Sequence, residues 1–216
     1  MSRAFAIVPV LLAATALPGE ARTALPGPAP VPGVVDHVLS VVTSAVAPSP
    51  GSSSSSSSSP SPSAGGRATS VSRASDLEAP LLTRINAVRR RFGLRPLVRS
   101  VQLTQAAVAH AQALAAAGYF SHNWSNGAPF QRWIRSFYPV AHAAFWSTGE
   151  NLLWGSQAIT PADAVDAWLA SPEHRRNLLA PKWRQIGIGV VRVGAAPGFY
   201  RGQDVAIAAT EFGVRR

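Results

Sequence analysis

Three side chains with metal-binding or acid–base chemistry lie in the second half of this 216-residue chain: His122, Glu150 and His174. Glu150 stands between a glycine and a run of apolar residues, in Gly149-Glu-Asn-Leu-Leu-Trp154. A carboxylate in apolar surroundings is costly unless it is paired, hydrogen-bonded or bound to a cation. Two imidazoles could supply that compensation, and the three groups together could hold a metal ion or activate water. Their separations of 28 and 24 residues match no local metal motif, so their meeting depends on the fold.

Signatures of other chemistries are missing from the sequence. It has no G-x-S-x-G, H-E-x-x-H, phosphate-loop or dinucleotide motif, so serine-hydrolase and nucleotide chemistry have no support. Cysteine is absent, which excludes disulfides, a thiolate metal site and a cysteine nucleophile. A further histidine, His110, falls on the apolar face of an expected helix. We interpret it as a structural core residue rather than a ligand.

The N-terminal third of the chain predicts export and a flexible tether. Residues 1–21 have the pattern of a secretory signal peptide, with Arg3 before an apolar stretch that is too short to span a membrane. No other segment is long and apolar enough to be a transmembrane anchor. Residues 22–75 are rich in Pro, Ser, Ala and Gly and predict a disordered linker. Within it, the locally apolar stretch 34–46 is expected to form a short helix or only transient order. Residues 76–216 form the single predicted domain.

The charge of the chain predicts the kind of partner. It has 20 Lys and Arg against 10 Asp and Glu, a formal net charge of +10. Such a field favours anionic partners. The run Arg89-Arg90-Arg91 has no interleaved aromatic residues for base stacking, so nucleic acid is not the expected partner.

Helices come first in the predicted domain and strands come last. Helices are predicted from the cap Asp76 to Gly93, from the cap Ser100 to Gly118, over 130–137, from the cap Thr160, and from Ser171-Pro172. Strands are predicted over 151–154, 186–190 and 205–212. Gly187 and Gly189 alternate with apolar residues, which indicates that another backbone approaches closely there. This order indicates an α+β fold with an antiparallel sheet.

Blocks of sequence in a fixed order carry a resemblance to a known family. They are Asn86-Ala-Val-Arg89 with Gly93-Leu-Arg-Pro-Leu97, Tyr119-Phe-Ser-His122, Gly149-Glu-Asn151, Trp168-Leu-Ala-Ser-Pro-Glu-His174-Arg-Arg-Asn177-Leu-Leu, and Ile186-Gly-Ile-Gly-Val190. From about Leu77 to Gly213 the chain resembles the CAP superfamily of cysteine-rich secretory, antigen 5 and pathogenesis-related proteins, in its bacterial, cysteine-free branch.

The resemblance implies a three-layer α-β-α sandwich with a small antiparallel sheet. It also implies a cleft that holds two histidines, which match His122 and His174, and two acids, the first of which matches Glu150. The second acid should follow Trp168 by three residues, where this chain has Ser171. The set is therefore incomplete, although two histidines and one carboxylate would leave an open zinc position.

Three functional hypotheses follow. The first is a secreted or wall-associated monomer that binds a lipid or an anionic envelope polymer through the cleft of His122, Glu150 and His174, and is not an enzyme. The alternative is a metal-assisted, peptidase-like hydrolase, in which the histidines hold zinc and Glu150 is a third ligand or the base. In the third hypothesis Glu150 only clamps the two imidazoles, as a structural element.

Overall fold

The structure is a computed structural model, and it describes residues 35–44 and 68–216. The predicted signal peptide over residues 1–21 and most of the predicted linker lie outside the described residues. The helices are α1 (Ser75–Arg91), α2 (Val101–Ala117), α3 (Phe130–Phe137), α4 (Pro161–Ala170) and α5 (Pro172–Leu178), with a 3-10 turn at Gly198–Tyr200. The strands are β1 (Val35–Ser44), β2 (Ser70–Arg73), β3 (Val98–Arg99), β4 (Trp146–Ser156), β5 (Gln185–Ala196) and β6 (Gln203–Arg215).

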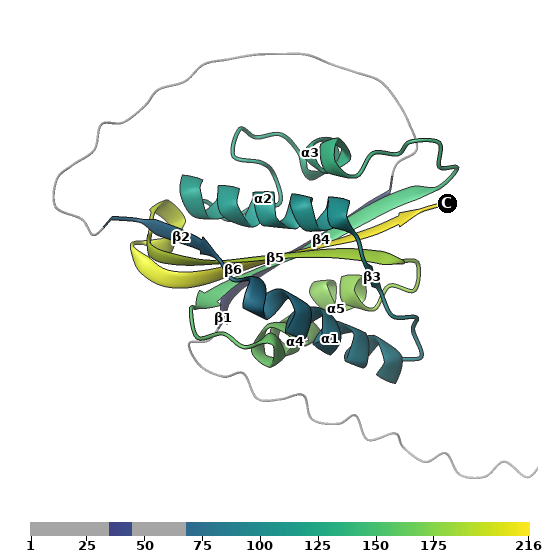
Figure 1. Ribbon diagram of the computed structural model, residues 1–216, viewed down its shortest axis with the longest axis horizontal. Coiled ribbons are helices and arrows are strands. Elements are labelled where there is room, and N and C mark those ends of the chain that lie inside the picture. Colours follow the sequence, from purple (N-terminus) through teal and green to yellow (C-terminus); the bar gives the residue numbers. More distant parts are fainter. Residues whose placement is uncertain (1–34, 45–67) are drawn as a thin grey trace, which may run out of the picture.

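These elements form three layers (Figure 1). The helices α2 and α3 cover one face of the sheet, and α1, α4 and α5 cover the other. The sheet order is β1-β4-β6-β5-β2 with antiparallel neighbours, and the short β3 pairs in parallel with β5. The predicted α+β class and α-β-α sandwich are therefore confirmed. Among the described residues, no helix combines the length and the apolar character needed to cross a membrane.

The sheet begins earlier in the chain than the sequence predicted. The stretch 34–46 was expected to form a short helix or transient order, but residues 35–44 form the strand β1, paired with β4. Valine recurs through this stretch, and β-branched residues favour strands. The strand β2 likewise precedes residue 76, where the domain was predicted to start. Parts of the predicted linker thus belong to the folded sheet.

Most of the predicted helix boundaries are confirmed, but the predicted N-cap of α1 is wrong. Ser100 Oγ accepts a hydrogen bond from the Leu103 amide at the start of α2, and α2 ends at Gly118 with φ 63°. Thr160 forms a capping box at the start of α4. Asp76 does not cap α1, because the cap position is Ala74; its carboxylate instead pairs with Arg192 of β5, 2.8 Å from Nη2. That ion pair ties the start of α1 to the sheet.

Close contact between α2 and β5 explains the glycines of β5. A Cβ added at Gly187 would lie 1.9 Å from the Leu103 carbonyl carbon, and one at Gly189 would lie 2.4 Å from the Ala107 carbonyl carbon. Real Cβ atoms do not approach so closely. The predicted approach of another backbone is therefore confirmed, and it holds α2 directly on the sheet, where its next turns reach β4 and β6.

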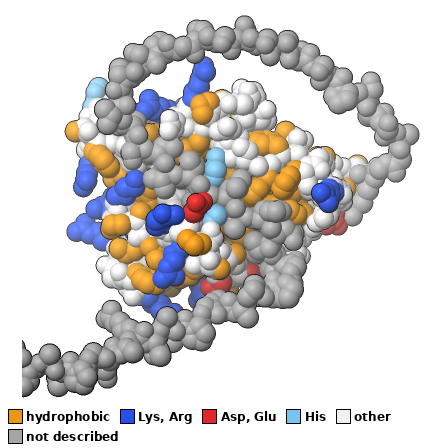
Figure 2. All heavy atoms as spheres, turned by 180° about the vertical axis from the view of Figure 1, so that it is seen from behind, with side chains coloured by type: hydrophobic (Ala, Val, Ile, Leu, Met, Phe, Trp, Pro, Cys, Tyr) orange, Lys and Arg blue, Asp and Glu red, His pale blue; other side chains and the backbone are white. Residues whose placement is uncertain are grey.

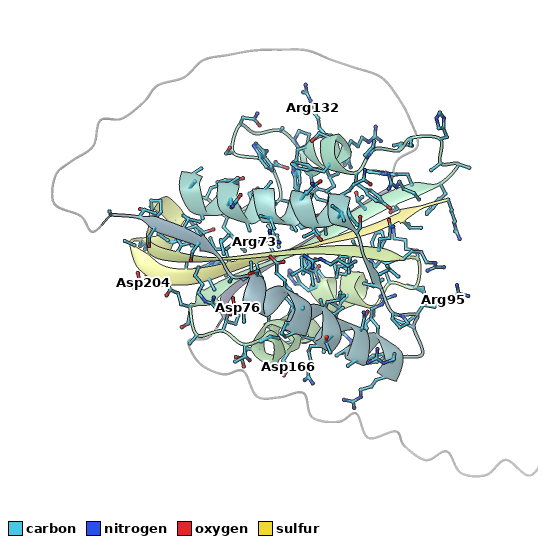
Figure 3. The ribbon with its side chains drawn as sticks, viewed as in Figure 1. Arg73, Asp76, Arg95, Arg132, Asp166 and Asp204 are labelled. Carbon is cyan, nitrogen blue, oxygen red and sulfur yellow. The ribbon has the colours of Figure 1, made fainter. Side chains whose placement is uncertain are left out.

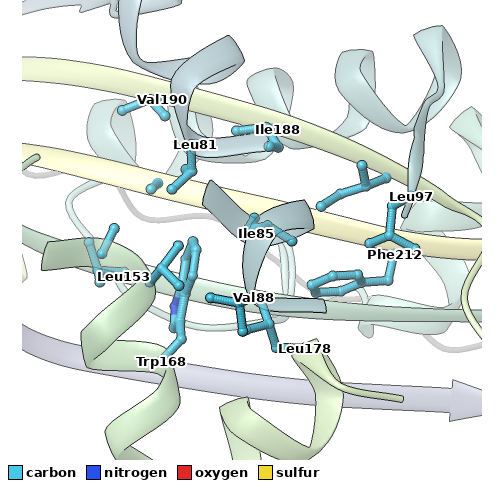
Figure 4. Close-up of a cluster of buried hydrophobic side chains, with 14 of the residues drawn as sticks. Leu81, Ile85, Val88, Leu97, Leu153, Trp168, Leu178, Ile188, Val190 and Phe212 are labelled. Carbon is cyan, nitrogen blue, oxygen red and sulfur yellow. The ribbon is translucent and has the colours of Figure 1, made fainter. Parts of the chain in front are cut away.

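Apolar side chains fill both spaces between the layers. On one face Leu81, Ile85 and Val88 of α1 pack with Trp168 of α4 and Phe212 of β6 (Figure 4). The Trp168 indole donates a hydrogen bond to the Leu152 carbonyl of β4, 3.2 Å away. On the other face the alanine-rich side of α2 packs on β4, β5 and β6, and a third cluster joins α2 to α3. Burial of these groups is the main stabilising term of the fold, and β4 lies between the two cores.

Candidate functional site

Glu150 is fully buried in the middle of β4, on the face of the sheet that α2 covers. His110 of α2 contacts it through Nδ1, 2.6 Å from Oε1. His122, in the loop after α2, contacts its other oxygen, Oε2, also through Nδ1. A carboxylate only accepts hydrogen bonds, so both Nδ1–H groups donate. Burial alone raises the pKa of Glu150, but the two histidines outweigh it and hold this pKa below its ordinary value. Glu150 is therefore a buried carboxylate that two imidazoles satisfy.

Glu211 of β6 is a second buried carboxyl group at the same place. It lies directly opposite Glu150 in the β4–β6 register and is likewise fully buried. Burial, together with the negative charge of Glu150, raises the pKa of Glu211 well above its ordinary value. We therefore expect a neutral carboxylic acid beside a carboxylate. As a neutral acid, Glu211 can donate its proton to the facing Glu150 carboxylate, which also raises the Glu211 pKa; no other partner for its two oxygens lies among the described residues.

We call these four groups the His/Glu cluster (His110, His122, Glu150 and Glu211), and aromatic rings pack against its His110 member. The rings of Trp124 and Trp133 lie 5.6 and 4.6 Å from the His110 ring, centroid to centroid. The Trp133 indole donates a 2.9 Å hydrogen bond to the His122 carbonyl, which fixes the loop. Burial and the charge of Glu150 raise the pKa of Tyr119 to about 12. For the fully buried His110, Glu150 and Glu211, charges and hydrogen bonds act more strongly than in water.

His174 lies on the other side of β4. It belongs to α5, which covers the opposite face of the sheet from α2 (Figure 1). Its side chain is 3% exposed, and its Nδ1 lies 2.6 Å from the Ser171 hydroxyl. Its carbonyl accepts a 3.2 Å hydrogen bond from the Asn151 side chain. Asn177 extends this link, because it donates to the Glu150 carbonyl at 3.1 Å and to Asn151 Oδ1 at 2.9 Å.

The structure thus divides the predicted site. It brings His122 and Glu150 together as expected, and it places His174 with Ser171, the residue that stands where the second acid was expected. The predicted metal set was His122, His174 and Glu150. The group whose ligand atoms lie within 4.8 Å of one another is instead His110, Glu150 and Glu211.

Sequence reasoning missed two members of the cluster. His110 was interpreted as structural, and it is indeed fully buried, but it contacts Glu150 directly. Glu211 is the only acid in the otherwise apolar strand 205–212, and the two-residue period of a strand places it on the face of Ile207 and Ala209. That isolated acid was the signal in the sequence, but nothing local indicated that it lies opposite Glu150.

The ligand atoms of His110, Glu150 and Glu211 lie close enough together to share a proton or to bind a small cation. His110 Nε2 and His122 Nε2 are buried and have no hydrogen-bond partner among the described residues, and the Glu211 oxygens have none apart from Glu150. Imidazole nitrogen with carboxylate oxygen is a donor set that suits zinc and other divalent transition metals. The same donors also suit proton exchange between the two carboxyl groups.

Comparison with known proteins agrees with the fold. The sequence model of CAP, the cysteine-rich secretory protein family, matches residues 82–202. The protein YkwD of Bacillus subtilis (strain 168) is 34% identical over 125 residues, which are 57% of this chain and 46% of that protein. This chain therefore spans about half the length of that relative.

Two solved structures are also similar. One is an outer surface protein from Borrelia burgdorferi, with a TM-score of 0.51 and 22% identity, covering 64% of this chain and 92% of that one. The other is an extracellular protein with an SCP domain from Bacillus anthracis str. Ames, with a TM-score of 0.49 and 21% identity, covering 65% of this chain and 41% of that one.

Proposed function

Because the chain belongs to the cysteine-rich secretory protein (CAP) family, we propose that it is an extracellular binding module for an anionic polymer of the cell envelope. The signal-peptide pattern over residues 1–21 supports export. The descriptions of the two similar structures as an outer surface protein and an extracellular protein agree with it. The buried His/Glu cluster does not itself face a polymer, so the binding surface has to lie elsewhere on the domain.

The observation that carries the proposal is an arginine patch at one end of the molecule. It consists of Arg90 and Arg91 at the end of α1, Arg95 in the segment that follows, and Arg175 and Arg176 of α5, all of them exposed. None of these five takes part in an ion pair between described residues. The arginines that do pair with acids are Arg73 and Arg99 with Glu78, Arg84 with Asp166, and Arg192 with Asp76.

The positions of the charges are visible in two views. Arg95 lies at the opposite end of the molecule from Asp204, and Asp76 lies between them (Figure 3). Lys and Arg side chains gather at one side of the rear face (Figure 2). Charges of one sign on one side attract a polyanion more strongly than the same charges spread evenly.

The fold holds the two halves of the patch together. Arg89 is fully buried, and its Nη1 donates to the Leu178 carbonyl at 2.6 Å and to the Ala180 carbonyl at 3.2 Å. Burial and the charge of Arg184 lower the pKa of Arg89 to about 10. The Arg175 guanidinium lies over the Phe92 ring, 5.1 Å from its centroid. These contacts fix the end of α1 beside α5.

Arginine suits a phosphate or carboxylate polymer because its planar guanidinium binds such groups through two parallel hydrogen bonds. Five guanidinium groups with no acidic partner would meet several repeats of a polymer at once. Such contacts weaken as salt rises, because exposed charges are screened beyond about 8 Å at physiological ionic strength.

A charge-reversal pair tests this proposal. The full chain, Arg175→Glu/Arg176→Glu, and the control Arg132→Glu/Arg201→Glu would be titrated with long-chain polyphosphate at about 0.15 M salt. The control residues are exposed arginines outside the patch, and both variants change the net charge equally. We expect at least about tenfold weaker binding for the patch variant, because each replaced arginine loses its pair of hydrogen bonds to the polymer. The control should bind nearly as tightly as the wild type.

Equal loss in the two variants would show that only net charge matters and would refute a dedicated patch. Vesicles of phosphatidylglycerol form the second arm of the titration, because an anionic lipid offers the same phosphate chemistry. Patch-dependent binding to vesicles but not to polyphosphate would identify the lipid as the partner. Melting curves of both variants show whether each still folds.

The unpartnered buried atoms of the cluster favour a second candidate function, a metal-assisted hydrolase. His110, Glu150 and Glu211 would hold the ion, which would supply a Lewis acid for water or a carbonyl group. Zinc content and cleavage of a peptide mixture would be measured for the full chain, Glu150→Gln and His174→Ala. Loss of both zinc and cleavage in Glu150→Gln, with both kept in His174→Ala on the other face of the sheet, supports this candidate. Absence of cleavage by the zinc-loaded full chain refutes it.

A further inference from the structure

The strand β1 has an unusual place for a piece of a low-complexity tether. It is the outermost strand of the sheet and pairs antiparallel with β4, the strand that carries Glu150. In that register Val41 lies opposite Glu150, and Leu39 lies opposite Leu152. Without β1, the edge of the site strand would be open along most of its length. An open strand edge is a template for pairing with another chain.

Two carbonyl groups at the β4 edge accept hydrogen bonds from side chains of α4 and α5, independently of β1. The Asn151 carbonyl accepts a 3.2 Å hydrogen bond from Thr210 of β6, so it points away from β1. Carbonyls alternate in direction along a strand, and the carbonyls of Glu150 and Leu152 therefore point towards β1. Those two accept hydrogen bonds from the side chains of Asn177 and Trp168, at 3.1 and 3.2 Å. Departure of β1 would free the amides of Glu150 and Leu152 but would leave neither carbonyl without a donor, so this edge strand costs less to release than an inner strand, which is paired on both sides.

The chain between β1 and β2 does not force β1 to stay. These two strands form opposite edges of the sheet, about 19 Å apart if four spacings of about 4.8 Å are counted. Twenty-five residues, 45–69, connect them. That length reaches about 85 Å when it is fully extended. Because the connector is much longer than the distance between the two strands, residues 35–44 can reach either the β4 edge of their own domain or that of another copy.

We propose that the β4 edge beside Glu150 is an acceptor for one extended strand, filled by residues 35–44 of the same chain and, in concentrated protein, by residues 35–44 of a second copy. The second copy is the fitting partner because its segment makes the same backbone pairs with β4. The intramolecular arrangement is then favoured only because the tether holds residues 35–44 near their own β4, at an effective concentration on the order of millimolar. This is strand addition at a sheet edge, which becomes strand exchange between identical chains.

The exchange would bear on the candidate site without depending on the arginine patch. While β1 is in place, it covers the edge of the strand that carries Glu150 and Asn151. When a second copy supplies the strand, the two His/Glu clusters become linked in one assembly. A failure of polymer binding would leave this inference standing, because no arginine takes part in it.

The test uses a labelled peptide of residues 34–46 and three forms of the full chain. Leu39→Pro/Val41→Pro removes the two amides that pair with Leu152 and Glu150, because proline has no N–H. Ser58→Pro adds a proline to the serine run and is the matched control. We expect the double variant to bind the peptide at least about tenfold more tightly than the wild type and the control, in which the tethered strand competes.

Hydrogen exchange and molar mass complete the test. The β1-facing amides of Thr148, Glu150, Leu152 and Trp154 should exchange at least about tenfold faster in the double variant than in the other two forms, and peptide should restore their protection. Light scattering should show dimer growing with concentration in the wild type and not in the double variant. Equal peptide binding by all three forms, binding by none, or equal exchange of the β4 amides would overturn the proposal. Near-UV circular dichroism shows that the double variant keeps its fold.

Discussion

Glu211→Gln is the substitution whose outcome depends most closely on the buried pair. The variant keeps the shape of the side chain but cannot ionise, so it imitates the neutral acid that the structure favours at this position. Glu211 is fully buried opposite Glu150, and its pKa is raised by burial and by that neighbouring charge. The wild type and the variant should therefore differ in how their stability depends on pH.

The sign follows from proton linkage. The folded state holds the Glu211 proton more tightly than the unfolded chain, in which a glutamate has a pKa of about 4.3. The resulting stability is fully present below that unfolded pKa and is lost as pH rises towards the folded pKa. Well above the unfolded pKa, each pH unit costs about 1.4 kcal/mol. From pH 4.5, where the unfolded glutamate is only partly ionised, to pH 6.5 the wild type should lose about 2.4 kcal/mol relative to Glu211→Gln, as long as folded Glu211 keeps its proton.

Urea unfolding of both proteins at pH 4.5, 5.5 and 6.5, with a chelator present, measures this difference. Glu173→Gln is the matched control, because it removes the same carboxyl group from the exposed surface of α5. Its difference from the wild type should stay within about 0.5 kcal/mol, as is usual for surface changes. A Glu211→Gln difference that does not change with pH would refute the reasoning, since Glu211 would then ionise in the folded protein as it does in the unfolded chain.

Three further substitutions probe the surrounding structure. Glu150→Ala removes the acceptor of two buried imidazole N–H groups and should lower the free energy of unfolding by about 3–5 kcal/mol in urea titrations; a loss below about 1 kcal/mol would show that the histidines find other partners. Gly187→Ala forces a Cβ into the α2 backbone and should cost more than about 4 kcal/mol or prevent folding, which expression and circular dichroism report; a wild-type melt would contradict the close approach. Thr160→Ala removes the α4 capping box and should cost about 1 kcal/mol, with Thr160→Ser as the near-neutral control.

The sequence was informative where local chemistry decides the structure. Ser100 and Thr160 were predicted as helix caps because their hydroxyls satisfy amides within the same turn, and both do so. Gly187 and Gly189 predicted a close backbone contact, and the ordered family blocks predicted the three layers. Asp76 shows the limit of such reasoning, because a distant arginine on β5 takes the carboxylate that local pattern assigned to the helix start.

The candidate site was only partly predictable, because its members meet through packing between distant elements. The stripe of α2 placed His110 inside the protein, but only the register of α2 on β4 shows that it faces Glu150. The apolar strand 205–212 marked Glu211 as odd, but strand pairing decides that it lies opposite Glu150. His174 was expected beside them, and the packing of α5 on the opposite face separates it. The strand β1 was missed because its surroundings are rich in Pro and Ser, while its own valines suit a strand.

The central claim is that His110 and His122 donate together to one buried carboxylate, that of Glu150. Nitrogen-15 NMR of the two imidazoles in the full chain tests this most directly, with Glu150→Gln as the comparison. The account predicts protons on Nδ1 of both rings, shifted far downfield, protected from exchange with water and changed together in Glu150→Gln. Rings protonated at Nε2 alone, or Nδ1 protons that exchange freely and do not respond to Glu150→Gln, would contradict it.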